Sequence, residues 1–486
     1  MSTSKSTPLV NQRGAKRLSL RQFVAYGGGD TANNLAFSLA LTFLPLYYTD
    51  VALISPATVG TIFLMMRFID AFTDVIIGSI VDRTSTRWGK FRPWIAFACI
   101  PLVIVAIACF AIPGQFYGTT WAVVWAAVSY FVMGSVFFTM VNVPYGSLAA
   151  AMTDNGEERA KLAIFRSVGA AIMQVLVAVA ISPSVQKYQG DPEGLQSAMI
   201  RTIAVLGVLA IALYFFLVVS ARENVERKVA KVSLGQSIEI LKKNRALQAL
   251  GLNSVVFLVA LFTGIGVLAY WSRDVLGDAR LMGAFAVILY GAVILLAPFL
   301  PRLIRQFGKP RLFQVGCFLG LVGGIIVYFS DADSIPLAFA GVVFIGVASG
   351  LGNSLMWNLE ADTIEYGEWK TGIRNEGTTY AIFSFMRKLG QAIGGAMGVW
   401  VIGWFGYNGE LETQSQSALD GISTAFGLIP AAFYFIALIL MQFYPMSDEQ
   451  HAEILEELRV RSERDDVERD TELPTAGLNH NPADQV

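Results

Sequence analysis

Two aspartates, Asp70 and Asp74, lie in an otherwise apolar stretch, residues 62–81. Their spacing of four residues puts both carboxylates on one face of a helix. A charged side chain at the centre of a bilayer costs roughly 2.5–3.5 kcal/mol on insertion scales. The pair therefore predicts a cation site or proton relay, as in a coupled transporter. Arg67, one turn earlier, leaves a second interpretation open, a buried salt bridge with one aspartate.

Other polar side chains in apolar stretches have two interpretations each. Asp30, Asn33 and Asn34 share a helical face near a glycine run, and could bind sugar hydroxyls or hydrogen-bond to neighbouring helices. Thr139 and Asn142, three residues apart, could add cation ligands or make the same interhelical bonds. The glycine run has no preceding strand and lacks the lysine of a nucleotide loop, so we expect it to serve helix packing.

Three cations and two aromatics complete the set of candidate side chains. Arg166, Arg387 and Lys388 lie within apolar stretches, where they need acids, cavity water or an anionic substrate group. Arg387 and Lys388 are about 100° apart on a helix, so they face different neighbours. Trp357 and Tyr145 could stack on a sugar ring, although packing is the commoner use of such residues.

The composition predicts the element type that positions these residues. Of the 486 residues, 54% are hydrophobic and 15% are charged, against roughly 25% charged in soluble domains. We expect an all-α integral membrane protein with twelve spans, each long enough for a bilayer. The expected spans are 22–49, 56–82, 92–112, 119–149, 160–182, 199–220, 247–275, 281–301, 311–329, 336–363, 377–406 and 417–444. The charges lie in loops and the tail, so nucleic acid is not an expected partner.

The basic loops predict orientation and organisation. Lysines and arginines gather in residues 1–21, 83–92, 221–246 and 302–311, which the positive-inside rule places in the cytoplasm together with both termini. The expected organisation is a cytoplasmic N-terminal segment, two six-helix bundles joined by a linker, and a cytoplasmic polar tail. The corresponding ranges are 1–21, 22–220, 221–246, 247–445 and 446–486. The polar N-terminus lacks the apolar region of a cleaved signal.

A repeated loop pattern supports a duplicated architecture, and the histidines and cysteines give no sign of catalytic chemistry. Residues 87–92 (RWGKFR) and 306–311 (QFGKPR) repeat an aromatic-Gly-Lys-x-Arg pattern at matching positions of the two halves, as in duplicated transporter folds. The two histidines, His451 and His480, lie in the tail, so protons crossing the membrane must use carboxylates. The three cysteines have no metal-site or disulfide spacing. We expect no enzyme and no cofactor; an enzyme of lipid-linked sugars is the remote alternative.

Several motifs resemble one family. Residues 78–83 (GSIVDR) are similar to the loop signature of the major facilitator superfamily. Five further runs resemble the glycoside–pentoside–hexuronide:cation symporters: 47–51 (YYTDV), 70–74 (DAFTD), 87–93 (RWGKFRP), 142–148 (NVPYGSL) and 361–368 (ADTIEYGE). Residues 26–34 (YGGGDTANN) and 384–395 (SFMRKLGQAIGG) are most similar to its glucuronide-carrier branch. The resemblance covers about residues 20–446.

The resemblance implies roles for the cation-site residues. The site of the family's sodium-coupled melibiose permease corresponds to Asp70, Thr73, Asp74, Thr139 and Asn142. Asn142 stands where the permease has a further aspartate, which favours proton over sodium coupling. Asp70 and Asp74 would hold a metal ion only if sodium is the coupling ion.

The resemblance also implies a sugar site. Arg166 and Lys388 match cationic sugar contacts of the permease, and Asn34, with Asn33 beside it, matches its sugar-gripping acid. The exchange of acid for amide with retention of both cations suits an anionic sugar. We expect a monomeric inner-membrane symporter for a small-molecule sugar glycoside, most simply a glucuronide, coupled to H⁺. The alternative is Na⁺-coupled uptake of a pentoside, neutral glycoside or sulfonated sugar. The expected substrate-binding residues are Asp30, Asn33, Asn34, Tyr145, Arg166, Trp357, Arg387 and Lys388.

Overall fold

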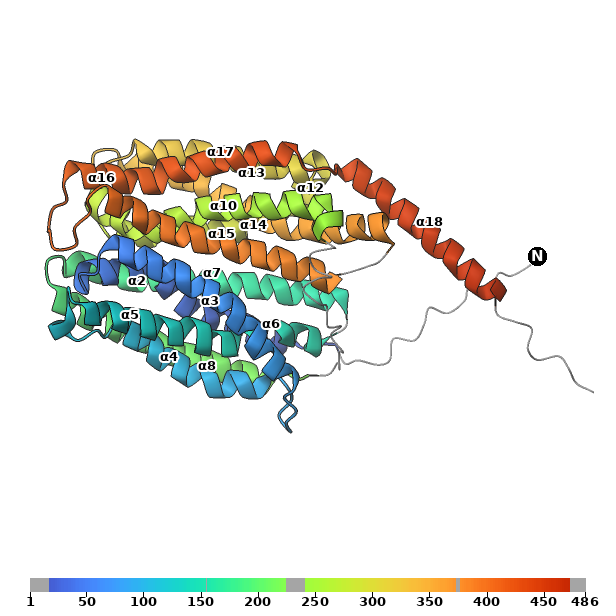
Figure 1. The fold of residues 1–486 in the computed structure, drawn as a ribbon, viewed down its shortest axis with the longest axis horizontal. Helices are drawn as coiled ribbons and strands as arrows, with labels where there is room; N and C mark the ends of the chain where they lie inside the picture. The colour runs from blue at the N-terminus through green and yellow to red at the C-terminus, as the bar shows by residue number, and fades with distance from the viewer. Residues whose placement is uncertain (1–16, 154, 224–240, 373–375, 473–486) are drawn as a thin grey trace, which may run out of the picture.

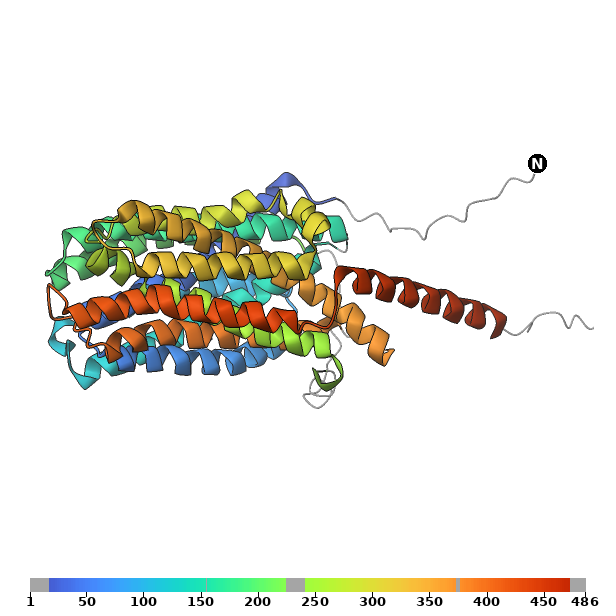
Figure 2. The ribbon, with the colours of Figure 1, turned by 90° about the horizontal axis from the view of Figure 1, so that it is seen from above.

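The computed structural model describes residues 17–153, 155–223, 241–372 and 376–472. In these residues the regular elements are helices, and a bridge pairs Thr86 with Gly89. Figure 1 shows two groups of helices, α1–α8 and α10–α17, lying side by side with their axes along the long direction of the molecule. Helix α18 projects from one end of the bundle in both views (Figure 2).

The first group contains α1 (Leu20–Ser38), η1 (Leu39–Phe43), α2 (Leu44–Leu46), η2 (Tyr47–Val51), α3 (Pro56–Asp82), α4 (Arg92–Cys109), η3 (Gly114–Phe116), α5 (Thr120–Phe131), η4 (Val132–Phe138), α6 (Thr139–Met152), α7 (Gly156–Lys187) and α8 (Pro192–Ser220). The second group contains α10 (Arg245–Tyr270), η5 (Trp271–Val275), α11 (Leu281–Leu296), α12 (Leu300–Phe307), α13 (Lys309–Tyr328), α14 (Ile335–Thr371), α15 (Glu376–Trp404), α16 (Gln416–Ser423), η6 (Thr424–Leu428) and α17 (Ile429–Gln442). Helix α18 (Asp448–Glu472) follows. The structure is thus all-α, as the composition predicts.

Each of the twelve expected spans coincides with a helical stretch. Among the described residues, eight helices are long and apolar enough to cross a membrane, and nine if the bent pair α11–α12 forms one span. Helices α3 and α15 have the length of a span but carry the charged groups discussed above. The number of twelve crossings therefore stays a prediction.

Prolines and π-turns break the regular period at several places. Helices α11 and α12 meet at 68°, where Pro298 and Pro301 each remove a backbone donor. The turns η1, η2, η4, η5 and η6 are π-helical. A π-turn inserts an extra residue and rotates the helix that follows, so faces assigned from a period of 3.6 shift beyond it.

The two repeated loops have matching geometry. Gly89 and Gly308 both have positive φ, +103° and +80°, which glycine adopts without steric cost. A carboxylate beyond the end of each helix group caps the backbone just after the glycine. Glu223 accepts from the backbone N–H groups of residues 90, 91 and 92, and Asp448 accepts from that of Lys309 at 2.8 Å. The pattern seen in the sequence thus marks a repeated capping arrangement.

Parts of the predicted organisation lie outside the described residues: 1–16, most of the linker (224–240) and the end of the tail (473–486). The division into two six-span halves at 221–246 stays a prediction. The charged tail forms a helix, α18.

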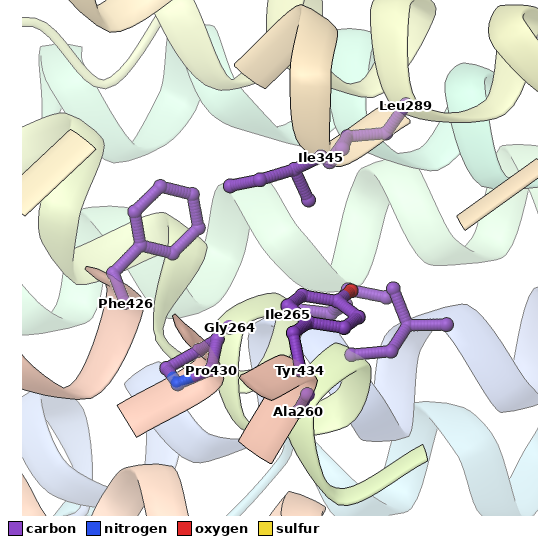
Figure 3. Close-up of a pocket in the computed structure, with 9 residues that line it drawn as sticks. Ala260, Gly264, Ile265, Leu289, Ile345, Phe426, Pro430 and Tyr434 are labelled. Atoms are coloured by element: carbon purple, nitrogen blue, oxygen red, sulfur yellow. The ribbon is translucent and has the colours of Figure 1, made fainter. Parts of the chain in front are cut away.

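The second helix group encloses an apolar pocket (Figure 3). Its lining combines residues of α10, α11, α14, η6 and α17: Ala260, Leu261, Gly264, Ile265, Leu289, Ile345, Phe426, Pro430 and Tyr434. A sugar needs several polar partners, and this lining offers one hydroxyl group. This pocket is therefore not the candidate sugar site.

Candidate functional site

Asp70 and Asp74 share one face of α3 but meet different partners. Ser135, in η4, donates its hydroxyl to Asp70 Oδ1, and Arg67 lies 3.8 Å from the other carboxylate oxygen. Asp74 is bound by the ammonium group of Lys388 on α15, in the other helix group. The two acids therefore differ in their partners. Asp70 is held within its own helix group, whereas Asp74 joins the two groups.

The remaining residues of the expected cation site point less directly at these acids. Thr73 donates to the backbone oxygen of Asp70 at 3.2 Å, and Thr139 donates to the backbone oxygen of Gly134 at 3.3 Å. Asn142 is half-buried, and in the described structure its side chain makes no hydrogen bond with another described residue. The π-turn η4 directly precedes Thr139, so the face predicted from regular periodicity is rotated.

A small pocket adjoins Asp70 on the side of α1. It is lined by Arg67 and Asp70 together with Ala36, Phe37, Ala40, Tyr130, Met133, Gly134 and Phe138. The guanidinium carbon of Arg67 lies 5.5 Å from the centre of the Phe37 ring. Asp70 is thus reachable by a small ion, and its nearest cation is one turn away on the same helix.

Asp30 and Arg166 form an ion pair between α1 and α7. Arg166 Nε lies 3.2 Å from Asp30 Oδ1, and the Arg166 side chain is 43% exposed although Asp30 is buried. The side-chain amide of Asn34 donates to the backbone oxygen of Asp30 at 2.9 Å and to its carboxylate at 3.3 Å. Arg166 is accordingly accessible, but its charge is already balanced by Asp30.

Asn33 and Tyr145 are held in the interior of the first helix group. The Asn33 carbonyl accepts from the Tyr214 hydroxyl at 2.7 Å, and Asn33 is 2% exposed. Tyr145 is fully buried, donates to the backbone oxygen of Tyr26 at 2.8 Å and stacks on that ring. Arg166 lies over the outer face of Tyr145 at 5.5 Å. In this conformation Tyr145 supports Arg166 rather than presenting a free ring.

Arg387 and Lys388 face different helices, as their spacing predicts. Lys388 reaches α3, whereas Arg387 turns toward α14 and donates to Asn353 Oδ1 at 2.7 Å. The Arg387 guanidinium carbon lies 4.8 Å from the centre of the Trp357 ring. Trp357 is 37% exposed, so the ring beside this buried arginine is partly accessible.

Polar contacts join the two helix groups at the end of the molecule that carries Asp50. Arg273 NH1 donates to Asp50 at 2.5 Å, and the Tyr407 hydroxyl lies 2.9 Å from both oxygens of the same carboxylate. Thr49 and Tyr270 share a hydrogen bond of 2.8 Å beside this cluster. The Asp50 and Arg273 side chains are only 10% and 8% exposed. Within the described residues, the hydrogen bonds and ion pairs between the two groups lie at this end or at Lys388–Asp74.

Comparison with known proteins explains this arrangement. The family model "MFS/sugar transport protein" matches residues 25–448. The chain belongs to this family of membrane transporters. It is 38% identical over 449 residues to the glucuronide carrier protein homolog of Escherichia coli K12, covering 91% of this chain and 96% of that protein. It is also 30% identical to a putative sulfoquinovose importer of the same organism, covering 95% of this chain and 98% of that protein.

The solved structures that the transporter resembles share its fold. A mutant of the nucleoside transporter NupG superposes with a TM-score of 0.63 at 14% sequence identity, covering 87% of this chain and all of that one. The chain is therefore a membrane transporter of the sugar-transport type with the major facilitator fold, and not an enzyme. The resemblance read from the motifs is confirmed.

Several residues of the site were absent from the sequence interpretation. Ser135 and Asn353 are uncharged residues of ordinary type in apolar helices, and gave no signal. Asp50 and Arg273 did carry one, because both are charged residues at the ends of apolar stretches. A search for opposite charges at matching ends of spans would have found this pair.

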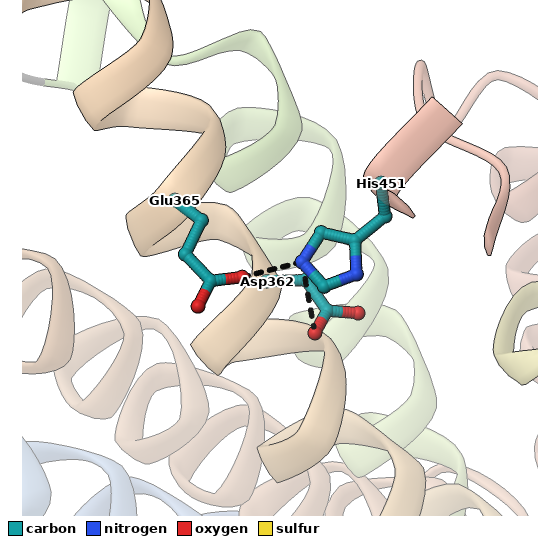
Figure 4. Close-up of side chains that lie close together, drawn as sticks. All are labelled: Asp362, Glu365 and His451. Carbon is teal, nitrogen blue, oxygen red and sulfur yellow. Dashed lines mark hydrogen bonds and ion pairs between the residues drawn. The ribbon is translucent and has the colours of Figure 1, made fainter. Parts of the chain in front are cut away.

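A polar cluster attaches α18 to α14. His451 Nε2 lies 2.5 Å from Glu365 and 3.7 Å from Asp362 (Figure 4). Their ligand-type atoms lie within 4.8 Å of one another, but Lys309 Nζ binds both oxygens of Asp362 at 2.7 Å. Because this lysine already supplies the positive charge, we interpret the cluster as an ionic attachment of α18 to α14.

Proposed function

We propose that the transporter imports an acidic sugar glycoside, most simply a glucuronide, together with a proton. The supporting observation is the ion pair between Lys388 and Asp74, which joins the expected cation site to the expected substrate site across the two helix groups. The likeness to the glucuronide carrier homolog supports the substrate class. In this proposal the transporter is a monomer in the bacterial inner membrane with both termini in the cytoplasm.

The ion pair suggests how proton binding and substrate binding are linked. A proton on Asp74 removes the negative charge that holds Lys388, and so adds a positive charge to the site that a substrate anion can balance. Release of the substrate anion and of the proton would restore the ion pair between Lys388 and Asp74. Substrate and cation then favour the same change of conformation through their different affinities for the two states.

The donor arrangement favours H⁺ over Na⁺. A proton needs one carboxylate oxygen, whereas a hard metal ion needs several converging oxygens. The hydroxyl groups of Thr73 and Thr139 donate to backbone oxygens, and Asp74 faces an ammonium group. Asp70, beside its small pocket, is the second acid at which a cation could bind.

A second candidate substrate is a sulfonated sugar. A sulfonate presents the same single negative charge to arginine and lysine donors, and one of the relatives is named a putative sulfoquinovose importer. Neutral glycosides would leave the positive charge of the cavity without a partner.

Transport by purified protein in liposomes tests the proposal. Proton and sodium gradients are imposed separately, and uptake of methyl β-D-glucuronide is compared with that of methyl β-D-glucoside. We expect proton-driven accumulation of the glucuronide, with an at least tenfold loss in Asp74→Asn. The exposed Asp420→Asn serves as the matched control. Equal uptake of both sugars would refute the anionic substrate, and unchanged accumulation by Asp74→Asn would refute its role in coupling.

A further inference from the structure

Arg387 is a buried cation without a carboxylate partner among the described residues. It is 8% exposed. Its guanidinium donates to the amide oxygen of Asn353 at 2.7 Å and lies 3.2 Å from the sulfur of Met356. Buried charges are normally paired, because taking a charge out of water is costly. The neutral amide of Asn353 orients this arginine without cancelling its charge.

The other cations between the helix groups are balanced. Arg67 lies 3.8 Å from Asp70, and Lys388 binds Asp74. Arg166 pairs with Asp30. Of these four cations, three are paired with the carboxylates of Asp70, Asp74 and Asp30, and the uncompensated charge is that of Arg387.

An aromatic surface lies directly beside this arginine. The Trp357 and Tyr380 rings stack with centres 5.7 Å apart and planes 23° from parallel. Trp357 and Tyr380 are 37% and 52% exposed, whereas Phe383, which meets Trp357 edge-on, is fully buried. The two open rings can bind the apolar C–H face of a pyranose by burial of apolar surface. A ring-linked acidic group would then lie close to Arg387.

We propose that Asn353 is a positioning residue that fixes Arg387 as the receptor for the acidic group of the substrate, while Trp357 and Tyr380 bind its ring. The inference rests on the proposed function and adds where anion selectivity originates. In this structure the Trp357 ring lies against the guanidinium in a cation–π contact. An oxyanion replaces that contact with charge-assisted hydrogen bonds, for which the planar guanidinium offers paired donors. Carboxylate and sulfonate share this chemistry.

The substitution Asn353→Asp tests the inference with almost no change in size. It places a carboxylate 2.7 Å from the guanidinium and neutralises it before substrate arrives. Binding to the full-length protein in nanodiscs is measured by calorimetry for methyl β-D-glucuronide, sulfoquinovose and methyl β-D-glucoside. Loss of one charge-assisted hydrogen bond predicts about 10- to 150-fold weaker binding of the acidic sugar that wild type binds. Neutral glucoside binding should change by less than about threefold, on the same scale of free energies.

Two further variants complete the design. Arg387→Gln should lose the same preference for acidic sugars, and monodisperse elution establishes that each variant is folded. Arg201→Gln removes a positive charge from the exposed side of α8 and should preserve wild-type binding. Equal losses for acidic and neutral sugars, or no loss in Asn353→Asp, would overturn the inference while leaving the proposed function intact. A wild type that binds neither acidic sugar would overturn both, and a wild type that binds only one identifies the oxyanion.

Discussion

The buried cluster at the Asp50 end predicts a shift of conformation in Asp50→Asn. Asn keeps the size of the side chain and one acceptor oxygen, but it loses the charged acceptor that faces Arg273 at 2.5 Å. Arg273 is not left unpaired, because it also binds Asp274 through two hydrogen bonds of 2.8 and 2.9 Å within its own helix group. The substitution therefore weakens the contact between the halves while the fold of each half is preserved.

The magnitude follows from the interaction that is lost. A hydrogen bond to a charged group contributes about 1.5–3 kcal/mol, and tenfold in an equilibrium constant corresponds to about 1.4 kcal/mol. The ratio of the conformer closed at this end to the conformer open there should fall by about 10- to 150-fold. Both carboxylate oxygens of Asp50 also accept from the Tyr407 hydroxyl. If this hydroxyl reorients to the remaining oxygen of Asn in the variant, less interaction is lost and the lower part of the range applies.

Distances between spin labels measure this ratio. Gln115→Cys and Thr413→Cys place labels on exposed positions of the two halves near this end, and the three native cysteines are buried. Asp50→Asn should add a population with longer distances. The control Asp331→Asn removes an exposed carboxylate whose hydrogen bonds stay within its own loop. An unchanged distance distribution in Asp50→Asn, or an equal change in the control, would refute the reasoning.

Two further predictions concern packing and the tail helix. A Cβ at Gly169 would lie 2.2 Å from the backbone oxygen of Gly27, so Gly169→Ala should destabilise the protein by about 1–3 kcal/mol in thermal unfolding. Gly146→Ala, which meets nothing within 4 Å, should be neutral or slightly stabilising, and equal losses would contradict the packing argument. His451→Ala removes the contact with Glu365, so amide exchange in α18 should accelerate; unchanged exchange would show that its apolar contacts suffice.

The sequence was sufficient for the elements and for the residue types of the site. Charges in apolar stretches are costly, so Asp70, Asp74, Arg387 and Lys388 could be recognised without a structure. The family motifs were equally local. The twelve helical stretches followed from the lengths of the apolar runs, although Pro298 and its neighbours break one of them sharply.

The pairing of these residues could not be predicted in the same way. Lys388 and Asp74 are 314 residues apart, and their contact depends on how the two halves face each other. Ser135 lies in a π-turn, where regular periodicity fails, and so it rather than Thr139 donates to Asp70. Spacing showed that Arg387 and Lys388 diverge, but not which of them meets an acid.

Because Lys388 meets an acid and Arg387 does not, the proposed transport cycle keeps the same net charge before and after binding. In this structure Lys388 neutralises Asp74, whereas Arg387 contacts the neutral amide of Asn353 and the ring of Trp357. One proton on Asp74 and one substrate anion add opposite charges to the cavity. The forms with and without proton and substrate then carry the same net charge, so binding adds no further charge that must move through a low-dielectric core. A proton alone leaves the freed ammonium without an acid, which opposes uncoupled leak.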